Sequence, residues 1–249
     1  SDMLYFVSIP ISYGFSGYYD NIGDMRNSGI ELALNGTLID RANFRWDAYA
    51  NFTHYTNKII MLPDEHKSRE IEGYLGYASG SKFVAEGLPL NTFLMPKYAG
   101  IDKTDGLPMW YKDVTDADGK VIGTSMTKEY SEATEYLCGD PTPALYGGFG
   151  TSLEFYGFDI SASFTYSVGG LTYDSGYAGY MSNPSSGGGD NYHKDILKAW
   201  TPENPNSDIP RWQYGDLYPA STSDRFLVDA SYLNFQNAQV GYTLPQKFT

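Results

Sequence analysis

The stretch GFGTSLEFYGFDISASFTYSVGG, residues 148–170, decides the fold. From Phe158 onward, apolar side chains occupy every second position. The apolar set is Phe158, Ile160, Ala162, Phe164, Tyr166 and Val168, and between them stand Asp159, Ser161, Ser163, Thr165 and Ser167. A period of two residues is typical of a β-strand with one apolar and one polar face. Since Tyr156-Gly157 can form a tight turn, the sequence predicts a hairpin of Leu145–Phe155 with Phe158–Val168.

Two further runs show the same period and predict a second hairpin. In the first run, 29–38, the apolar residues fall on even positions, as in Ile30, Leu32, Leu34 and Leu38. The second run, FRWDAYANFTHY, puts Phe44, Trp46, Ala48, Ala50 and Phe52 on one face. Only residues 39–43 separate the two runs, so we expect their strands to pair directly.

Other strand signals are less regular. A fifth strand is predicted at 232–244, where the apolar phase shifts between Phe235 and Ala238 as a β-bulge would cause. Weaker strands are expected at 83–101 and 107–113, around the turn KTDG. The first residues, SDMLYFVSIP, resemble the end of a strand. Because both ends of the chain read as interrupted strands, we expect a piece of a longer protein.

The composition predicts an all-β chain and excludes several function classes. The 249 residues include 23 Tyr, 13 Phe, 4 Trp and 27 Gly, a mixture that favours strands and turns. A net charge of −13 without a basic stripe argues against nucleic acid as a partner. The single Cys138 excludes an internal disulfide. The sequence contains no run of about 18 apolar residues, so no membrane-spanning helix is predicted.

The lengths of the connections alternate, and this favours a transmembrane β-barrel. The two hairpin turns are short, whereas the segments after Tyr55 and Val168 run for dozens of residues. Outer-membrane barrels have short periplasmic turns and long outer loops, with apolar residues facing lipid and polar residues facing the lumen. The polar positions predicted to face the lumen are Arg45, Asp47, Asn51, Ser161, Ser163 and Thr165. A soluble sandwich with one wet face gives the same alternation and stays open as an alternative.

Five blocks of sequence resemble the SusC/RagA family of TonB-dependent outer-membrane transporters. The blocks are NIGDMRNSGIELAL (21–34), EGLPLNTFLMPKYAGIDKTDGLPMW (86–110), GDPTPALYGGF with YGFDIS (139–161), WTPENPNSDIPR (200–211) and DASYLNFQNAQVGYTLP (229–245). They stand in the order that the family shows and extend over nearly the whole chain. The resemblance implies an antiparallel barrel segment with long extracellular loops, part of a 22-stranded barrel.

The resemblance also implies a setting and partners. Family members import glycans or peptides across the outer membrane of Bacteroidetes, with a SusD-like surface lipoprotein that lids the barrel. The TonB-ExbB-ExbD complex supplies energy by pulling on an N-terminal plug. This sequence contains neither the plug nor a TonB box, so residues 1–249 are expected to be the C-terminal part of the barrel, embedded in outer-membrane lipid and completed by the rest of the chain. No cofactor is implied.

Aromatic residues in the long loops are the candidate substrate contacts. Trp110, Tyr111, Trp200, Trp212 and Tyr214 stand near Asp and Asn side chains. Aromatic faces and planar hydrogen-bonding groups together suit a sugar. The alternative is that these rings pack the loops or face the lipoprotein. The segment NYHKDILKAW (191–200), which leads into the block WTPENPNSDIPR, could form a short helix with Ile196, Leu197 and Trp200 on one side.

Catalytic and metal chemistry have little support in the sequence. His54, His66 and His193 lack metal-ligand spacing, and no hydrolase or nucleotide-binding motif is present. The acidic run 113–123 lacks key calcium ligands and is interpreted as an Asp-Gly turn. We therefore predict a non-enzymatic oligosaccharide importer without metal. The alternatives are import of peptides by the same transporter class, or a soluble all-β glycan-binding module.

Overall fold

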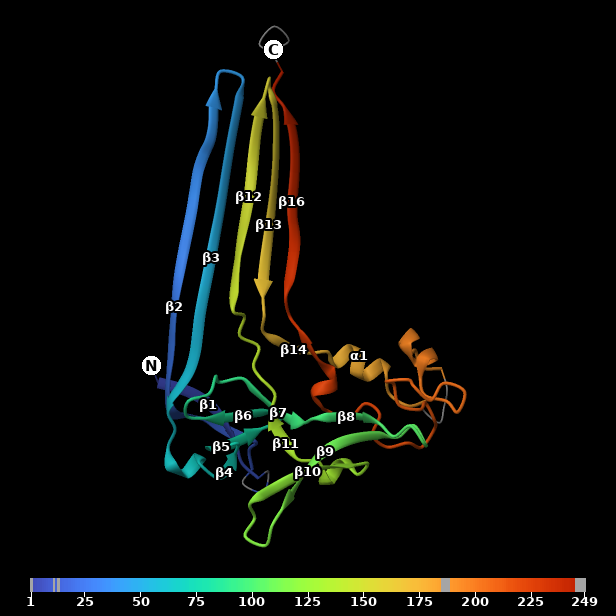
Figure 1. Ribbon diagram of the computed structural model, residues 1–249. Helices are drawn as coiled ribbons and strands as arrows, with labels where there is room; N and C mark the ends of the chain where they lie inside the picture. Colours follow the sequence, from blue (N-terminus) through green and yellow to red (C-terminus); the bar gives the residue numbers. More distant parts are fainter. Residues whose placement is uncertain (1, 11, 13, 185–188, 245–249) are drawn as a thin grey trace. The chain divides into compact units, whose positions relative to one another are not determined.

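The computed structural model describes residues 2–10, 12, 14–184 and 189–244, and its fold is all-β (Figure 1). Contacts divide the chain into two compact units. The first, called the sheet unit, comprises 1–60, 141–171 and 229–249. The second, called the loop unit, comprises 61–140 and 172–228. The long connections predicted from sequence therefore form a unit of their own.

The sheet unit is one six-stranded sheet with the order β1-β2-β3-β12-β13-β16. Its strands are β1 (Asp2–Ser8), β2 (Gly17–Arg41), β3 (Phe44–Met61), β12 (Leu145–Phe155), β13 (Phe158–Val168) and β16 (Tyr232–Tyr242). β12, β13 and β16 each have 11 residues, the length that a tilted strand needs to cross a bilayer. The strand expected at the first residues is β1, apart from Ser1, which lies outside the described residues.

The predicted hairpins are confirmed. β12 and β13 pair from Leu145↔Val168 to Phe155↔Phe158 around the turn Tyr156-Gly157. Both turn residues have positive φ, 49° and 86°, as two-residue hairpins with the right twist require. The turn between β2 and β3 is shorter than the predicted segment 39–43, because β2 continues through Asp40 and Arg41. These charged residues interrupt the apolar alternation without interrupting the strand.

The predicted bulge in the last strand is also confirmed. The register of β16 against β13 shifts between Ser163 and Phe164, whose partners are Asn237 and Phe235. Gln236 is therefore the extra residue. β16 ends at Tyr242, two residues before the predicted end, and Pro245 of the corresponding sequence block lies outside the described residues.

The weaker strands predicted at 83–101 and 107–113 belong to the loop unit and not to the six-stranded sheet. A five-stranded sheet has the order β11-β7-β6-β5-β4, and a three-stranded sheet has the order β10-β9-β8. Their bounds are β4 (Arg69–Ile71), β5 (Tyr74–Ser79), β6 (Lys82–Ala85), β7 (Thr92–Pro96), β8 (Tyr98–Ile101), β9 (Pro108–Thr115), β10 (Val121–Thr127) and β11 (Glu135–Leu137). β14 (Leu171–Tyr173) pairs with β15 (Leu227–Asp229).

The helical segments are short. α1 spans Ser175–Tyr180, and 3₁₀ turns occupy Asp64–His66, Tyr130–Glu132, Lys194–Lys198 and Asp224–Phe226. The 3₁₀ turn at Lys194–Lys198 lies inside the predicted helix 191–200, and Leu197 within it is 91% exposed. Across the described residues, no helix has the length and apolar character needed to cross a membrane.

Two hydrophobic clusters of described residues lie in the loop unit. One contains Phe83, Ala85, Leu88 and Leu94, with Ile71 and Leu137 packed against it. The other contains Ala178, Met181 and Phe226, with Tyr173, Tyr177, Ile196 and Ile209 packed against it. In the sheet unit, by contrast, large apolar side chains such as Val240 are exposed (72%). That exposure suits a sheet whose apolar face meets lipid.

Candidate functional site

The strand registers place the predicted lumen-facing residues on one face of the six-stranded sheet. Asp47 pairs with Ser152, Ser152 with Ser161, and Ser161 with Gln239, which forms one polar row. Because side chains alternate along a strand, the other predicted residues fall on the same face. They are Arg45, Asn51, Ser163 and Thr165. The intervening rows, such as Trp46–Leu153–Ile160–Val240, form the apolar face.

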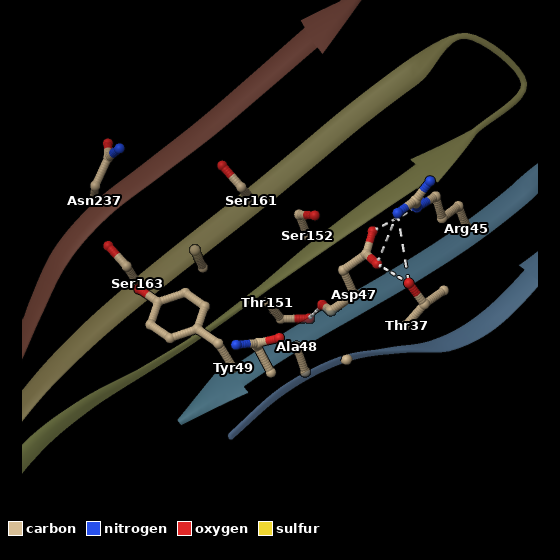
Figure 2. A pocket seen from close by; sticks show the side chains of 13 residues that line it. Thr37, Arg45, Asp47, Ala48, Tyr49, Thr151, Ser152, Ser161, Ser163 and Asn237 are labelled. Atoms are coloured by element: carbon tan, nitrogen blue, oxygen red, sulfur yellow. Dashed lines mark hydrogen bonds and ion pairs between the residues drawn. The ribbon is translucent and has the colours of Figure 1, made fainter. Parts of the chain in front are cut away.

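The polar face contains a hollow of about 550 Å³ (Figure 2). Its lining comes from β2, β3, β12, β13 and β16. The lining residues are Asn35, Gly36, Thr37, Arg45, Asp47, Ala48, Tyr49, Thr151, Ser152, Ser161, Ala162, Ser163 and Asn237. Hydroxyl and amide groups dominate this list, so the hollow can offer many neutral hydrogen bonds.

One ion pair accounts for the charges in this hollow. Arg45 Nε donates to Asp47 Oδ2 at 2.8 Å, and Thr37 Oγ1 donates to Asp47 Oδ1 at 2.6 Å (Figure 2). Both charged side chains are partly exposed, and an exposed ion pair of this kind contributes little to stability because water screens it. Its main effect is to fix the two side chains and to neutralise the charge of the hollow.

Tyr49 is the aromatic side chain of the hollow. It stands at a polar position of β3, its side chain is 45% exposed, and its ring lies over Gly150 of β12. A Cβ at Gly150 would lie 2.5 Å from Tyr49 Cε1, so glycine leaves the room that the ring occupies. Tyr49 is not among the residues predicted from the sequence, although an aromatic residue at a polar position of a two-faced strand is a usable signal.

Hydrogen bonds satisfy the polar atoms of aromatic residues on the apolar face. The Trp46 indole N–H donates to Thr151 Oγ1 at 2.7 Å, and the Tyr166 hydroxyl donates to the backbone oxygen of Asn51 at 3.0 Å. An unpaired N–H or O–H in hydrocarbon is costly. The Tyr166 bond passes over Gly147, where a Cβ would collide with the same backbone oxygen. These two bonds suit a face in contact with lipid.

The structure does not place Trp110 where it could touch a substrate. Its side chain is 1% exposed, and its ring packs edge-on against Tyr130 (5.2 Å) and Tyr218 (6.0 Å). This corrects the expectation that Trp110 presents its face to a sugar. Alternation along β9 would have been the relevant signal, because neighbouring Tyr111 is exposed.

Trp200 packs within the loop unit. Its indole ring covers Gly106, which has a φ of +74°, and its N–H donates to the backbone oxygen of Lys103 at 3.2 Å. Arg211 fixes the other end of the same loop, since its backbone N–H donates to the Gly106 oxygen and its guanidinium forms a two-bond pair with Asp216. The Pro-rich segment 201–210 is thus held at both ends, as expected for a stiff loop.

The β8–β9 turn that receives Trp200 has its own electrostatic anchor. Lys128 Nζ lies 2.6 Å from Asp102 Oδ2 and 2.8 Å from Asp105 Oδ2. The hydrogen bond from Lys128, with further bonds from Thr104, holds the pKa of Asp102 well below its ordinary value. The turn therefore depends on an ionised carboxylate.

The remaining predicted contacts, Tyr111, Trp212 and Tyr214, are exposed. Trp212 lies edge-on to Tyr192, with ring centroids 5.1 Å apart. Tyr192 and Tyr180 are not among the residues predicted from the sequence, and Tyr180 is exposed at the end of α1. Both follow glycine-rich segments that read only as turns.

The acidic run 113–123 covers the turn between β9 and β10 together with the adjoining strand ends. The Asp116 carboxylate accepts the backbone N–H groups of Asp118 and Lys120, and Gly119 takes a φ of +79°. This accounts for its Asp-Gly pattern without a metal. Within the described part of the chain, no three His, Cys, Asp or Glu side chains are grouped to hold a metal ion.

Curated relatives match almost the whole chain. TonB-dependent receptor P3 of Formosa agariphila is 28% identical over 257 aligned positions, which cover 99% of this chain and 24% of the relative. TonB-dependent receptor SusC of Bacteroides thetaiotaomicron is 24% identical over 97% of this chain and 23% of its own length. The chain thus spans about a quarter of the curated relatives it matches. No family model matches it.

Solved structures give the same result for the fold. The RagAB peptide importer in its closed-closed state matches 99% of this chain and 26% of the solved chain, with a TM-score of 0.79 and 29% identity. The open-open state of that importer matches with a TM-score of 0.74. The similarity includes both the strands and the long connections, since it covers nearly every residue.

Proposed function

We propose a role for this chain from the premise that it is a homologue of the SusC/RagA-type TonB-dependent transporters of the outer membrane, and that its sheet is a segment of their barrel. In this role the chain forms part of the wall of an importer for oligosaccharides. The whole protein would work with a SusD-like surface lipoprotein and draw energy from the TonB-ExbB-ExbD complex. Residues 1–249 would be the C-terminal part of that barrel.

The main support for a role in import is that the six-stranded sheet has one apolar and one polar face. The pairing of neighbouring strands brings the apolar positions onto one face and the polar positions onto the other. The apolar face, which includes Trp46, Ile160 and Val240, suits outer-membrane lipid. The polar face suits an aqueous passage. We assign Arg45, Asp47, Asn51, Ser161, Ser163 and Thr165 to the wall of that passage.

The neutral polar surface favours oligosaccharides as cargo. Hydroxyl and amide groups surround Tyr49, and the charges of Arg45 and Asp47 compensate each other. In the loop unit, exposed aromatic residues such as Tyr111, Trp212 and Tyr214 remain candidates for sugar contacts. An aromatic face with nearby hydrogen-bonding groups suits a sugar ring.

Import of peptides is the second candidate. Its support is the similarity to the RagAB peptide importer, with a TM-score of 0.79 over 99% of this chain. Both cargoes can use the same barrel, so the fold does not separate them.

Growth of a deletion strain tests the proposal. The full-length gene is deleted and then restored in trans, and growth is measured on single neutral oligosaccharides and on a casein digest as the only carbon source. We expect loss of growth on one class of oligosaccharide and its recovery on restoration. Loss on the peptide digest alone would favour the second candidate, and growth unchanged on every substrate would contradict nutrient import.

A further inference from the structure

The loop unit holds a second cleft, of about 470 Å³, beside α1. This volume lies in the range of about 300–1,000 Å³ that is usual for small-molecule sites. Ser175, Gly176 and Gly179 of α1 line one side, and Tyr180 and Tyr192 provide aromatic rings. The cleft contains none of the five loop residues predicted from sequence, although Tyr192 contacts Trp212.

The two glycines of α1 are not required by the packing of the described chain. Glycine disfavours a helix more than any residue except proline. Neither Gly176 nor Gly179 has a positive φ. A Cβ at Gly179 would meet no atom within 4 Å, and one at Gly176 would make only an ordinary 3.5 Å contact with Asp174 Oδ1. Their effect is to leave bare backbone beside the cleft, where a flat ligand can approach closely.

The opposite side of α1 fixes this bare surface in place. Ala178 and Met181 are buried in a cluster with Phe226, and Tyr177 packs against the same cluster. Asp174 caps the helix by accepting the Tyr177 N–H at 2.8 Å. The helix is therefore held from behind while Gly176 and Gly179 face the cleft.

Both aromatic rings are at least partly accessible, and the ring of Tyr192 is held by contacts of its own. Tyr180 is 54% exposed, so most of its ring is available to a ligand. Tyr192 lies edge-on to Trp212 at an interplanar angle of 75°, and the Trp212 N–H donates to the backbone oxygen of Ser182 at 3.1 Å. Ring faces held in this way suit stacking on the C–H surface of a sugar.

The polar groups of the cleft suit a neutral ligand with many hydroxyls. Asp190 and Asn191 contribute a carboxylate and an amide, and Ser175 and Ser182 contribute hydroxyls. Among the described residues that line it, none is Lys, Arg or His, so an anionic ligand would lack a countercharge. The smaller cleft lined by Lys128, Glu129, Arg211 and Asp216 differs in this respect, because it is rich in charge.

We propose that the cleft beside α1 binds one sugar ring of a neutral oligosaccharide, with Tyr180 and Tyr192 as stacking residues and the backbone at Gly179 as the floor. Asp190 and Asn191 bind hydroxyl groups of that ring. The assignment rests on the proposed import of oligosaccharides, and it places a recognition site among residues of the loop unit.

Titration calorimetry on the full-length transporter, purified with its partner lipoprotein, tests the assignment. The probes are maltohexaose, cellohexaose, laminarihexaose, mannohexaose and xylohexaose. Gly179→Leu fills the cleft with a residue that favours helices, and Tyr180→Ala removes a ring. We expect wild type to bind at least one probe, and each variant to bind it about 10-fold more weakly, the loss expected for one stacking contact. Tyr74→Ala removes an exposed tyrosine from β5 and should leave the affinity unchanged.

Two results would overturn the assignment. Wild type that binds none of the five hexasaccharides has no site of this kind. Wild-type affinity in both variants would show that the sugar binds elsewhere, and in that case growth of the wild-type strain on the same sugar still supports the proposed import. If Gly179→Leu unfolds the loop unit, as thermal unfolding would reveal, Tyr180→Ala alone decides.

Discussion

At Gly147, two strands of the sheet lie so close together that one added methyl group would destabilise the fold. A Cβ there would collide with the backbone oxygen of Asn51 on β3 and approach the Tyr166 hydroxyl. Backbone cannot turn aside as the end of a side chain can. The residue is therefore fixed by space and not by backbone conformation, since its φ is not positive.

We predict that Gly147→Ala lowers the free energy of unfolding of the full-length protein by about 1–3 kcal/mol, because the added methyl forces β3 and β12 apart. Guanidinium unfolding in detergent measures the change. Gly36→Ala is the matched control, because its Cβ would meet no atom within 4 Å in the same sheet. Equal stability of the two variants would contradict the predicted collision.

Asp102 gives the loop unit a pH dependence. Lys128 and Thr104 lower its pKa in the folded protein, whereas the unfolded value is about 3.9. A lowered folded pKa contributes stability above the unfolded pKa, and this stability is lost as the pH falls through the folded value. The contribution is therefore complete at neutral pH and declines below about pH 4.

We predict that Asp102→Asn destabilises the β8–β9 turn at pH 7 and that its difference from wild type shrinks as the pH falls from 5 to 3. Lys128→Gln should show the same trend, because it removes the partner of the same carboxylate. Hydrogen exchange of residues 102–107 over this pH range measures the effect. A difference that stays constant across the range would exclude ionisation of Asp102 as its cause.

At the scale of the element, the bulge at Gln236 sets which face each half of β16 presents. Phe235 pairs with Phe164 on the apolar face, and Asn237 pairs with Ser163 on the polar face. The two pairs are neighbours along β13 and therefore lie on opposite faces of the sheet. Their partners on β16 match these faces only because Gln236 adds one residue between them. A shift of one residue moves every side chain of a strand to the opposite face.

Deletion of Gln236 is expected to prevent assembly of the barrel, since residues 232–235 would turn polar groups to lipid. Gln236→Ala keeps the residue count and loses only the hydrogen bond from Nε2 to Thr165 Oγ1, so it should assemble. The heat-modifiable band of folded barrel in unboiled gel samples separates the two outcomes. A normal folded band from the deletion variant would show that the register can slip without loss.

Strands in which apolar and polar residues alternate over many positions could be predicted from the sequence. Short strands and strands without apolar alternation could not. β3, β12, β13 and β16 follow their apolar residues closely. β2 starts at Gly17, twelve residues before the predicted run, because its first half is a strand without apolar alternation. β4 and β11 have three residues each, too few to show a period.

At the scale of the whole molecule, the faces of the sheet could be predicted but the packing of the loops could not. Asp47 and Ser161 share a face because alternation and pairing alone decide it. Trp110 and Trp200 were selected as candidate substrate contacts because a sequence shows that a loop is long, not that it folds around its own clusters. Their contacts with Tyr130 and Gly106 join residues 20 and 94 positions apart, beyond the reach of any local pattern.

The unequal strand lengths of the sheet unit limit the hydrophobic thickness of the membrane that it fits. An 11-residue strand such as β13, at about 3.3 Å per residue and a tilt of about 45°, rises through about 26 Å. β2 has 25 residues, so more than half of it continues into water, where its contacts with β3 become polar, as in Ser28–Thr56. The shorter strands therefore set the hydrophobic thickness, and a bilayer much thicker than about 26 Å would cover polar strand ends or have to thin around them.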